Sequence, residues 1–139
     1  MRRERNRGFS LVELIVVVLI LGILAVSLAP QVMKWVGRSK ESLDFQEADK
    51  IKAAAQTALA EFESVNGVTV LQDEKYNVTS AGVVAAAGGT ELNTGMTALL
   101  EEYLGGEYPA VQSVSGKVFQ IQLKATGRKI YVTTVTGTY

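Results

Sequence analysis

The chain has 139 residues and a formal net charge of zero, so it can form one small domain at most. It has no histidine, which removes the commonest general base and the commonest metal ligand, and no cysteine, which excludes disulfides. No basic patch interleaved with aromatic residues is present, so nucleic acid is not expected as the main partner, although a small local DNA contact stays open.

The charge is unevenly distributed along the chain. Residues 1–8 carry four arginines and one glutamate, a sum of +3, whereas the rest carries ten basic and thirteen acidic residues, a sum of −3. The serine and threonine hydroxyls have no histidine to activate them, and the carboxylates do not follow the spacing of a calcium loop. We therefore predict no catalytic residue, no enzyme activity, no cofactor and no metal.

The first predicted element is an apolar helix, because the twenty residues from Leu14 to Met33 carry no charge. At about 1.5 Å per residue such a run spans roughly 30 Å, the thickness of the hydrocarbon core of a bilayer. The arginines before it should stay in the cytoplasm by the positive-inside rule, which places the C-terminus outside. Glu13 stands at the start of this run, where a carboxylate costs free energy, so its presence needs a cause.

Two ordinary membrane signals compete for this segment. A secretory signal peptide would be cut after residues 27–29, but its apolar region is usually only about 7–15 residues long, and Pro30 would directly follow the cut. A plain signal anchor explains the length of the run. Neither of them explains Glu13.

The sequence GFSLVE at residues 8–13, followed by the apolar helix, resembles the processing motif of type IV prepilins and pseudopilins. The resemblance covers about residues 7–30. It implies that a prepilin peptidase cuts between Gly8 and Phe9 and methylates the new N-terminal residue, Phe9. Glu13 then becomes the fifth residue of the mature chain, where the family places its glutamate.

This resemblance gives Glu13 a role in assembly. Its carboxylate would pair with the N-terminal amine of Phe9 on a neighbouring subunit or on the same chain, which supplies attraction and register in a low dielectric. The alternative is a carboxylate that merely snorkels to the membrane surface. Gly22 and Pro30 match the glycine and proline of the family's helix, which can unwind between them on assembly. Pro30 also predicts a kink, and an intact kinked helix is the alternative.

The resemblance implies three segments: a cleaved leader at residues 1–8, a transmembrane and assembly helix at 9–33, and an amphipathic helix plus pilin head at 34–139. The leading hypothesis is a structural subunit of a type IV pilus, with adhesion, twitching motility or DNA uptake downstream. The alternatives are a pseudopilin of a type II secretion or competence machine, and a monomeric, signal-anchored binding domain.

The implied partners are the prepilin peptidase and methyltransferase, further copies of the chain and minor pilins, an inner-membrane assembly platform, and membrane lipid before assembly. The precursor would be a single-pass membrane protein with a cytoplasmic N-terminus. Its product would belong to an extracellular, periplasmic or wall-spanning filament.

After Pro30 the pattern becomes amphipathic, so one helix is predicted from Phe9 to about Val65, ended by the glycine of Asn66-Gly67. Its apolar stripe contains Val32, Val36, Leu43, Ala48, Ile51, Ala55, Leu59 and Phe62. Its polar face contains Lys40, Glu41, Asp44, Glu47, Asp49, Lys50 and Lys52. The cations that follow the apolar run, which could meet lipid phosphates or form a solvated rim, are Lys34, Arg38 and Lys40.

The middle of the chain has weaker patterns. Val68–Leu71 is compatible with a short strand, and Ser80–Gly89 with a loop or a loosely formed helix. A short helix capped by Thr94 and closed by Gly105 is predicted next. It rests on the helical spacing of Met96, Leu99, Leu100 and Tyr103.

The C-terminus changes to a period of two, which predicts strands. An antiparallel hairpin is expected from residues 119–125 and 130–136 around a turn at Thr126-Gly127, with a third strand at Ala110–Val114. The predicted core packs one helix face on one strand face, and its members are Ile51, Leu59, Phe62, Phe119, Ile121 and Leu123. The predicted fold is therefore α+β, a long helix packed on a small C-terminal antiparallel sheet, which is the pilin architecture by resemblance.

Overall fold

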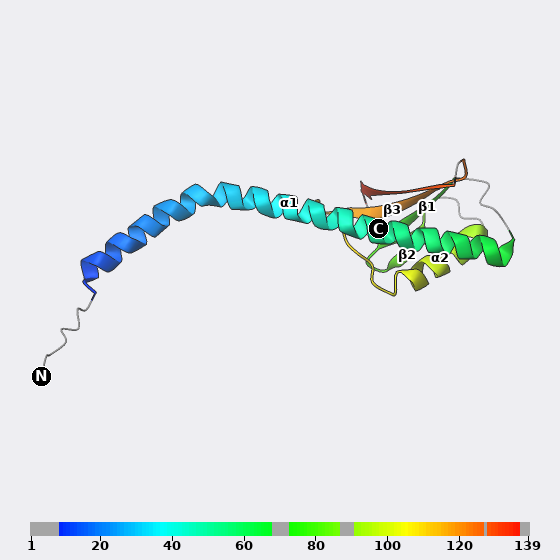
Figure 1. The fold of residues 1–139 in the computed structure, drawn as a ribbon, viewed down its shortest axis with the longest axis horizontal. Coiled ribbons are helices and arrows are strands. Elements are labelled where there is room, and N and C mark those ends of the chain that lie inside the picture. The colour runs from blue at the N-terminus through cyan, green and yellow to red at the C-terminus, as the bar shows by residue number, and fades with distance from the viewer. Residues whose placement is uncertain (1–8, 68–72, 87–90, 127, 137–139) are drawn as a thin grey trace, which may run out of the picture. The chain divides into compact units, whose positions relative to one another are not determined.

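The computed structural model describes residues 9–67, 73–86, 91–126 and 128–136 (Figure 1). The elements in chain order are α1 (Leu11–Asn66), β1 (Glu74–Thr79), β2 (Gly82–Ala85), α2 (Glu91–Tyr103), β3 (Lys117–Lys124) and β4 (Lys129–Thr136). The chain forms two compact units, Met1–Arg38 and Ser39–Tyr139, which we call the N-terminal unit and the head. A long helix and an antiparallel sheet confirm the predicted α+β class.

The helix α1 is a single element of 56 residues. It ends where the sequence predicts, because Gly67 adopts a φ of +60° and its amide donates to the carbonyl of Glu63 at 3.1 Å. The helix is uninterrupted through Gly22 and Pro30. Unwinding between Gly22 and Pro30 would occur on assembly, so it stays a prediction, as does a kink at Pro30.

The head contains a four-stranded antiparallel sheet in the order β2-β1-β3-β4. The predicted C-terminal hairpin is confirmed, with a register that runs from Lys117 opposite Thr136 to Lys124 opposite Lys129. The alternation in β3 also holds, since Phe119, Ile121 and Leu123 are buried on one face.

The third strand was predicted in the wrong place. Residues 110–114 form no strand, and the sheet is completed instead by β1 and β2. The interpretation of Ser80–Gly89 as a loop or helix is wrong at Gly82–Ala85, which is β2, and Val68–Leu71 lies outside the described residues. In β1 the sequence EKYNVT buries Glu74, Tyr76 and Val78, an alternation hidden by residue types that are poor strand formers.

The short helix was predicted correctly, but its start was not. Because α2 begins at Glu91, Thr94 lies inside the helix and is not its N-cap. The closing residue is confirmed, since Gly105 has a φ of +67°. The side chain of Glu101 ties α2 to the sheet by accepting a hydrogen bond from the amide of Val83 in β2 at 3.0 Å.

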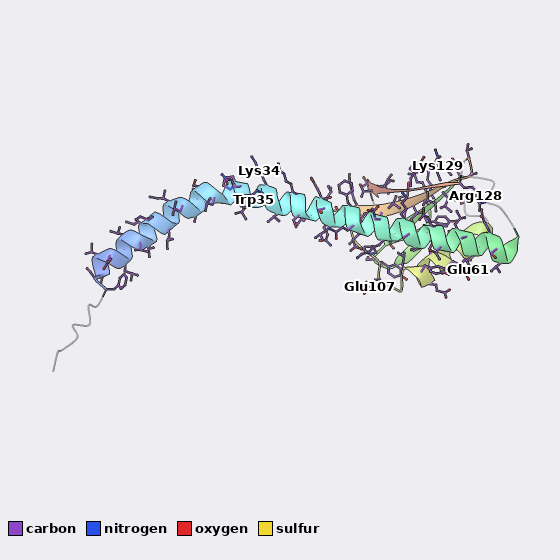
Figure 2. All side chains as sticks on the ribbon, in the orientation of Figure 1. Lys34, Trp35, Glu61, Glu107, Arg128 and Lys129 are labelled. Atoms are coloured by element: carbon purple, nitrogen blue, oxygen red, sulfur yellow. The ribbon has the colours of Figure 1, made fainter. Side chains whose placement is uncertain are left out.

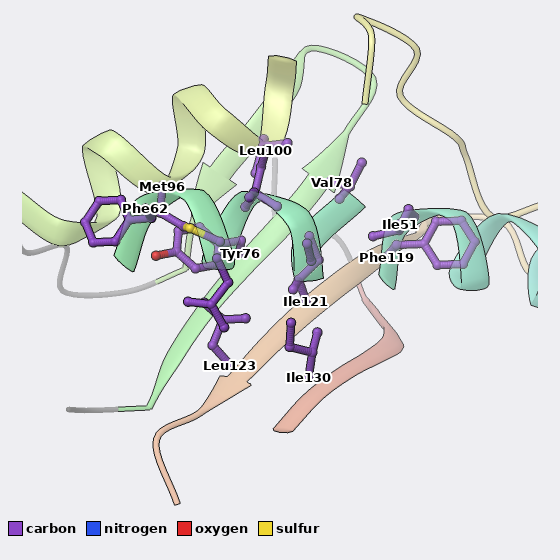
Figure 3. Packing of buried hydrophobic residues seen from close by; sticks show 14 residues of the cluster. Ile51, Phe62, Tyr76, Val78, Met96, Leu100, Phe119, Ile121, Leu123 and Ile130 are labelled. Carbon is purple, nitrogen blue, oxygen red and sulfur yellow. The ribbon is translucent and has the colours of Figure 1, made fainter. Parts of the chain in front are cut away.

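The core of the head joins α1, α2 and the inner face of the sheet (Figure 3). All six residues of the predicted core are buried in this one cluster, which confirms the predicted packing. From α1 it takes Ile51, Ala55, Ala58, Leu59 and Phe62. The earlier members of the predicted stripe, Val32, Val36 and Leu43, are 45–49% exposed, so only the later part of the stripe contributes to the core.

Asp44 is the exception on the predicted polar face, because only 8% of it is exposed. Its two carboxylate oxygens accept hydrogen bonds from the amides of Gln112 at 2.7 Å and Ser113 at 2.9 Å. Desolvation of the carboxylate favours a higher pKa, but these hydrogen bonds outweigh it and lower the pKa of Asp44. Asp44 thus anchors the segment between α2 and β3 to α1.

Replacing Asp44 with Asn should destabilise the head at neutral pH and matter less in acid. A lowered folded-state pKa gives stability that is present above the unfolded pKa of about 3.9 and is lost as the pH falls through the folded value. Urea unfolding of wild type and variant from pH 7 to pH 2.5 checks this. The exposed Asp49→Asn variant is the control, and a wild-type-to-variant difference that does not shrink below about pH 4 would contradict the anchoring role.

Candidate functional site

The start of α1 holds the residues that the sequence predicts as functional. Phe9 is 81% exposed just before the helix, and Glu13 is exposed in the first helical turn. Helical hydrogen bonding begins when the amide of Leu14 donates to the carbonyl of Ser10 at 3.2 Å. Gly8, the residue before the predicted cut, lies outside the described residues.

The electrostatics of this turn favour a carboxylate. The first amides of a helix have no partner within the helix, and the helix dipole places partial positive charge there. Glu13 therefore lies where an anion is favoured. Within the described ranges Glu13 forms no ion pair, so its carboxylate is open to a cation from another molecule.

The apolar surface of the N-terminal unit is not covered by the chain itself. From Leu11 to Leu28 fourteen large apolar side chains are exposed, by between 42% and 77%. Fully burying one such side chain is worth about 1.5–3 kcal/mol, so this surface requires lipid or other protein around it. In the described part of the chain, α1 is the one helix long and apolar enough to cross a membrane, with a mean hydropathy of 3.0 in a window that is 0% buried.

Gly22 lies in the middle of this surface. It lines a shallow groove with Val18, Leu19, Ile23 and Val26, and a Cβ added to it would meet nothing within 4 Å. Small residues of this kind let a neighbouring helix approach closely in an apolar environment. Pro30 lies inside the helix, eight residues further on.

The predicted cations after the apolar run, Lys34, Arg38 and Lys40, are all exposed. Sequence reasoning did not single out Trp35, which is 63% exposed and lies in sequence between Lys34 and Arg38. Figure 2 shows Lys34 and Trp35 on α1. A tryptophan flanked by cations at the end of an apolar run is a signal that could have identified it. Across the described ranges, no cluster of Asp or Glu side chains could hold a metal ion.

Residues 3–29 match the family described as the prokaryotic N-terminal methylation motif. The chain is 31% identical over 75 residues to a fimbrial protein of Pseudomonas aeruginosa, covering 54% of this chain and 49% of that one. It is 32% identical over 96 residues to the type IV major fimbrial protein FimA of Dichelobacter nodosus, covering 69% and 58%. It is 55% identical over 38 residues to the type IV major pilin protein PilA of Myxococcus xanthus, covering 27% and 17%.

Each of these curated matches covers only part of the relative's own length. The chain spans about half the length of the first two curated relatives. The comparison with solved structures found no match.

Proposed function

We propose that this protein is the structural subunit of a type IV pilus. The chain carries the prokaryotic N-terminal methylation motif, and it has relatives named type IV fimbrial and pilin proteins. The observation that carries the proposal is the uncovered apolar surface of α1 from Leu11 to Leu28, which lies within the matched segment, residues 3–29. Such a surface suits a helix that leaves lipid and packs against the same helix of other copies.

The proposed sequence of events begins with a membrane-anchored precursor. A prepilin peptidase cuts between Gly8 and Phe9 and methylates Phe9. The helix from residue 9 to 33 then moves from lipid into a bundle of subunit helices, where Glu13 meets the amine of Phe9 from a neighbour. Gly22 allows neighbouring helices of the bundle to approach closely, and the helix can unwind between Gly22 and Pro30.

The fimbrial function is favoured over a pseudopilin because the relatives are named fimbrial and pilin proteins. A monomeric anchored domain is disfavoured because its lipid-facing helix would need neither the methylation motif nor Glu13. The proposed partners are further copies and minor pilins, the peptidase, an inner-membrane assembly platform, and lipid before assembly. Electron microscopy of sheared surface material, with mass spectrometry of its subunits, tests the filament itself.

The mature chain should begin at Phe9 and carry one added methyl group there. Gly8 gives a peptidase unhindered access to the backbone, because it has no side chain. Mass spectrometry of the native N-terminus checks this, and Gly8→Val is expected to leave the leader in place. An intact Met1, or a cut after Ala29, would contradict the proposed processing.

A further inference from the structure

The structure points to a second contact between copies, beyond the apolar helices. We propose that Trp35, with Lys34 and Arg38 beside it, docks into a groove on the head of a neighbouring copy. This proposal rests on the proposed pilus function. It adds to the filament a heterologous contact, which is a contact between two different surfaces of neighbouring copies. We call the three residues the basic anchor, and the groove between α1 and residues 103–112 the acidic groove.

The acidic groove is large enough to take an aromatic side chain. Its volume is about 520 Å³, within the range of about 300–1,000 Å³ typical of binding clefts. Its apolar surface includes Tyr103, Leu104, Tyr108 and Pro109, the last three of which are half-buried. Rings and aliphatic groups of this kind form the pocket into which an interface tryptophan inserts.

The rim of the acidic groove is negative. Glu47 and Glu107 line it, and Lys50, the cation beside them, is already bound to Glu47 at 2.8 Å. The hydrogen bond and charge of Glu47, with a further contribution from Glu107, raise the pKa of Lys50. Tyr103 donates its hydroxyl hydrogen to Glu61, so another carboxylate lies at one end. Figure 2 shows Glu61 and Glu107 on the head.

The basic anchor has the opposite charge and an exposed ring. Trp35 is the single tryptophan of the chain and is 63% exposed. No acidic residue occurs between Glu13 and Glu41, so Lys34 has no carboxylate within one helical turn and Arg38 has only Glu41, three residues further along. Among the described residues neither of them forms an ion pair. Tryptophan and arginine are the residues most enriched among those that dominate interface energies.

The two surfaces favour a second copy as the occupant because one chain carries both members of a complementary pair. A contact between two different surfaces of identical subunits is heterologous, and it continues into an open helical polymer when the rotation does not close a ring. The competing role for Trp35 is insertion among lipid headgroups, where tryptophan is also enriched. That role leaves the acidic groove without an occupant.

Cysteine crosslinking in filaments tests the contact, and the natural chain provides a background without cysteine. In the Gln31→Cys/Ala110→Cys variant, which retains the whole basic anchor and the carboxylates of the acidic groove, a short bismaleimide reagent should give a ladder of multimers. The single variants should give at most weak dimers, and the matched Gln31→Cys/Lys129→Cys pair should give no ladder. Filaments without a ladder, or an equal ladder from the control pair, would overturn the docking. Absence of filaments from the wild type would instead overturn the proposed pilus function.

Charge and ring substitutions give a second measurement. Trp35→Ala should reduce filament yield by about tenfold or more while the amount of monomer in the membrane is unchanged. Glu107→Lys should also reduce the yield, and adding Lys34→Glu to it should restore part of that loss. If Trp35→Ala depletes the membrane fraction and leaves filaments per monomer unchanged, Trp35 acts on lipid and the docking proposal fails. Failure of Lys34→Glu to restore any filaments would contradict the charge pairing.

Discussion

Replacing Glu13 with Ala is expected to give processed monomer in the membrane and few or no filaments. Removing a charge from a membrane helix makes insertion as favourable or more so, because a carboxylate costs about 2.5–3.5 kcal/mol at the centre of a bilayer and less near its edge. The four arginines of residues 1–8 remain, so orientation and cleavage should persist. What is lost is the proposed partner of the amine of Phe9 in the next subunit.

The size of the effect follows from the dielectric. Removing one member of a buried ion pair typically costs about 3–5 kcal/mol, because the other member stays charged without a partner. In a polymer this cost recurs at every subunit. Membrane fractionation measures the amount of monomer in the membrane, and filament counts on the same cells measure assembly. Glu41→Ala, which removes an exposed carboxylate further along α1, is the control. Normal filaments from Glu13→Ala would refute the pairing, and loss of protein from the membrane would indicate a role in insertion.

Truncating Phe62 to Ala should lower the free energy of unfolding of the head by about 3–5 kcal/mol. Phe62 is 6% exposed and belongs to the core cluster of α1, α2 and the sheet. Its ring lies against α2, since a Cβ on Gly95 would come within 3.0 Å of it. The truncation therefore leaves a cavity where two helices meet, and no disulfide can offset the loss in a chain without cysteine.

Phe45 provides a matched control for this measurement. It lies on the same helix but is 73% exposed, so Phe45→Ala should change the free energy of unfolding by less than about 0.5 kcal/mol. Urea unfolding of the full chain in a mild detergent, monitored by the signal of the head, compares the two variants. Equal midpoints for wild type and Phe62→Ala would show that the core does not depend on this ring.

The features that could be read from the sequence are those with a regular period. The long helix, its end at Gly67 and the hairpin of β3 and β4 follow from spacings of 3.6 and 2 and from one turn residue. The strand β1 was missed because lysine, asparagine and glutamate weaken its signal, although its buried face is regular. The strand β2 was missed because four residues between small side chains carry too short a pattern.

Features made by residues distant in sequence were beyond reach. The helical pattern places Asp44 among charged neighbours, and only the fold brings the amides of Gln112 and Ser113 to its carboxylate. The acidic groove likewise combines α1 with residues 103–112, which no local pattern connects. The candidate assembly residues Phe9 and Glu13 could be proposed from the sequence alone because their signal is entirely local, a short motif beside an apolar run.

The sheet order has a consequence for handling this protein at high concentration. β4 is the end strand, and within the described ranges no further strand pairs with its outer edge. Residues 130–136 carry no charge, and six of the seven are β-branched. An open edge of that composition is a template for edge-to-edge aggregation. Lys129, a charged residue at the start of the strand, opposes such pairing only at that end. Precipitation of concentrated protein would therefore begin along β4 and grow as stacked sheets, by a route separate from helix-driven polymerisation.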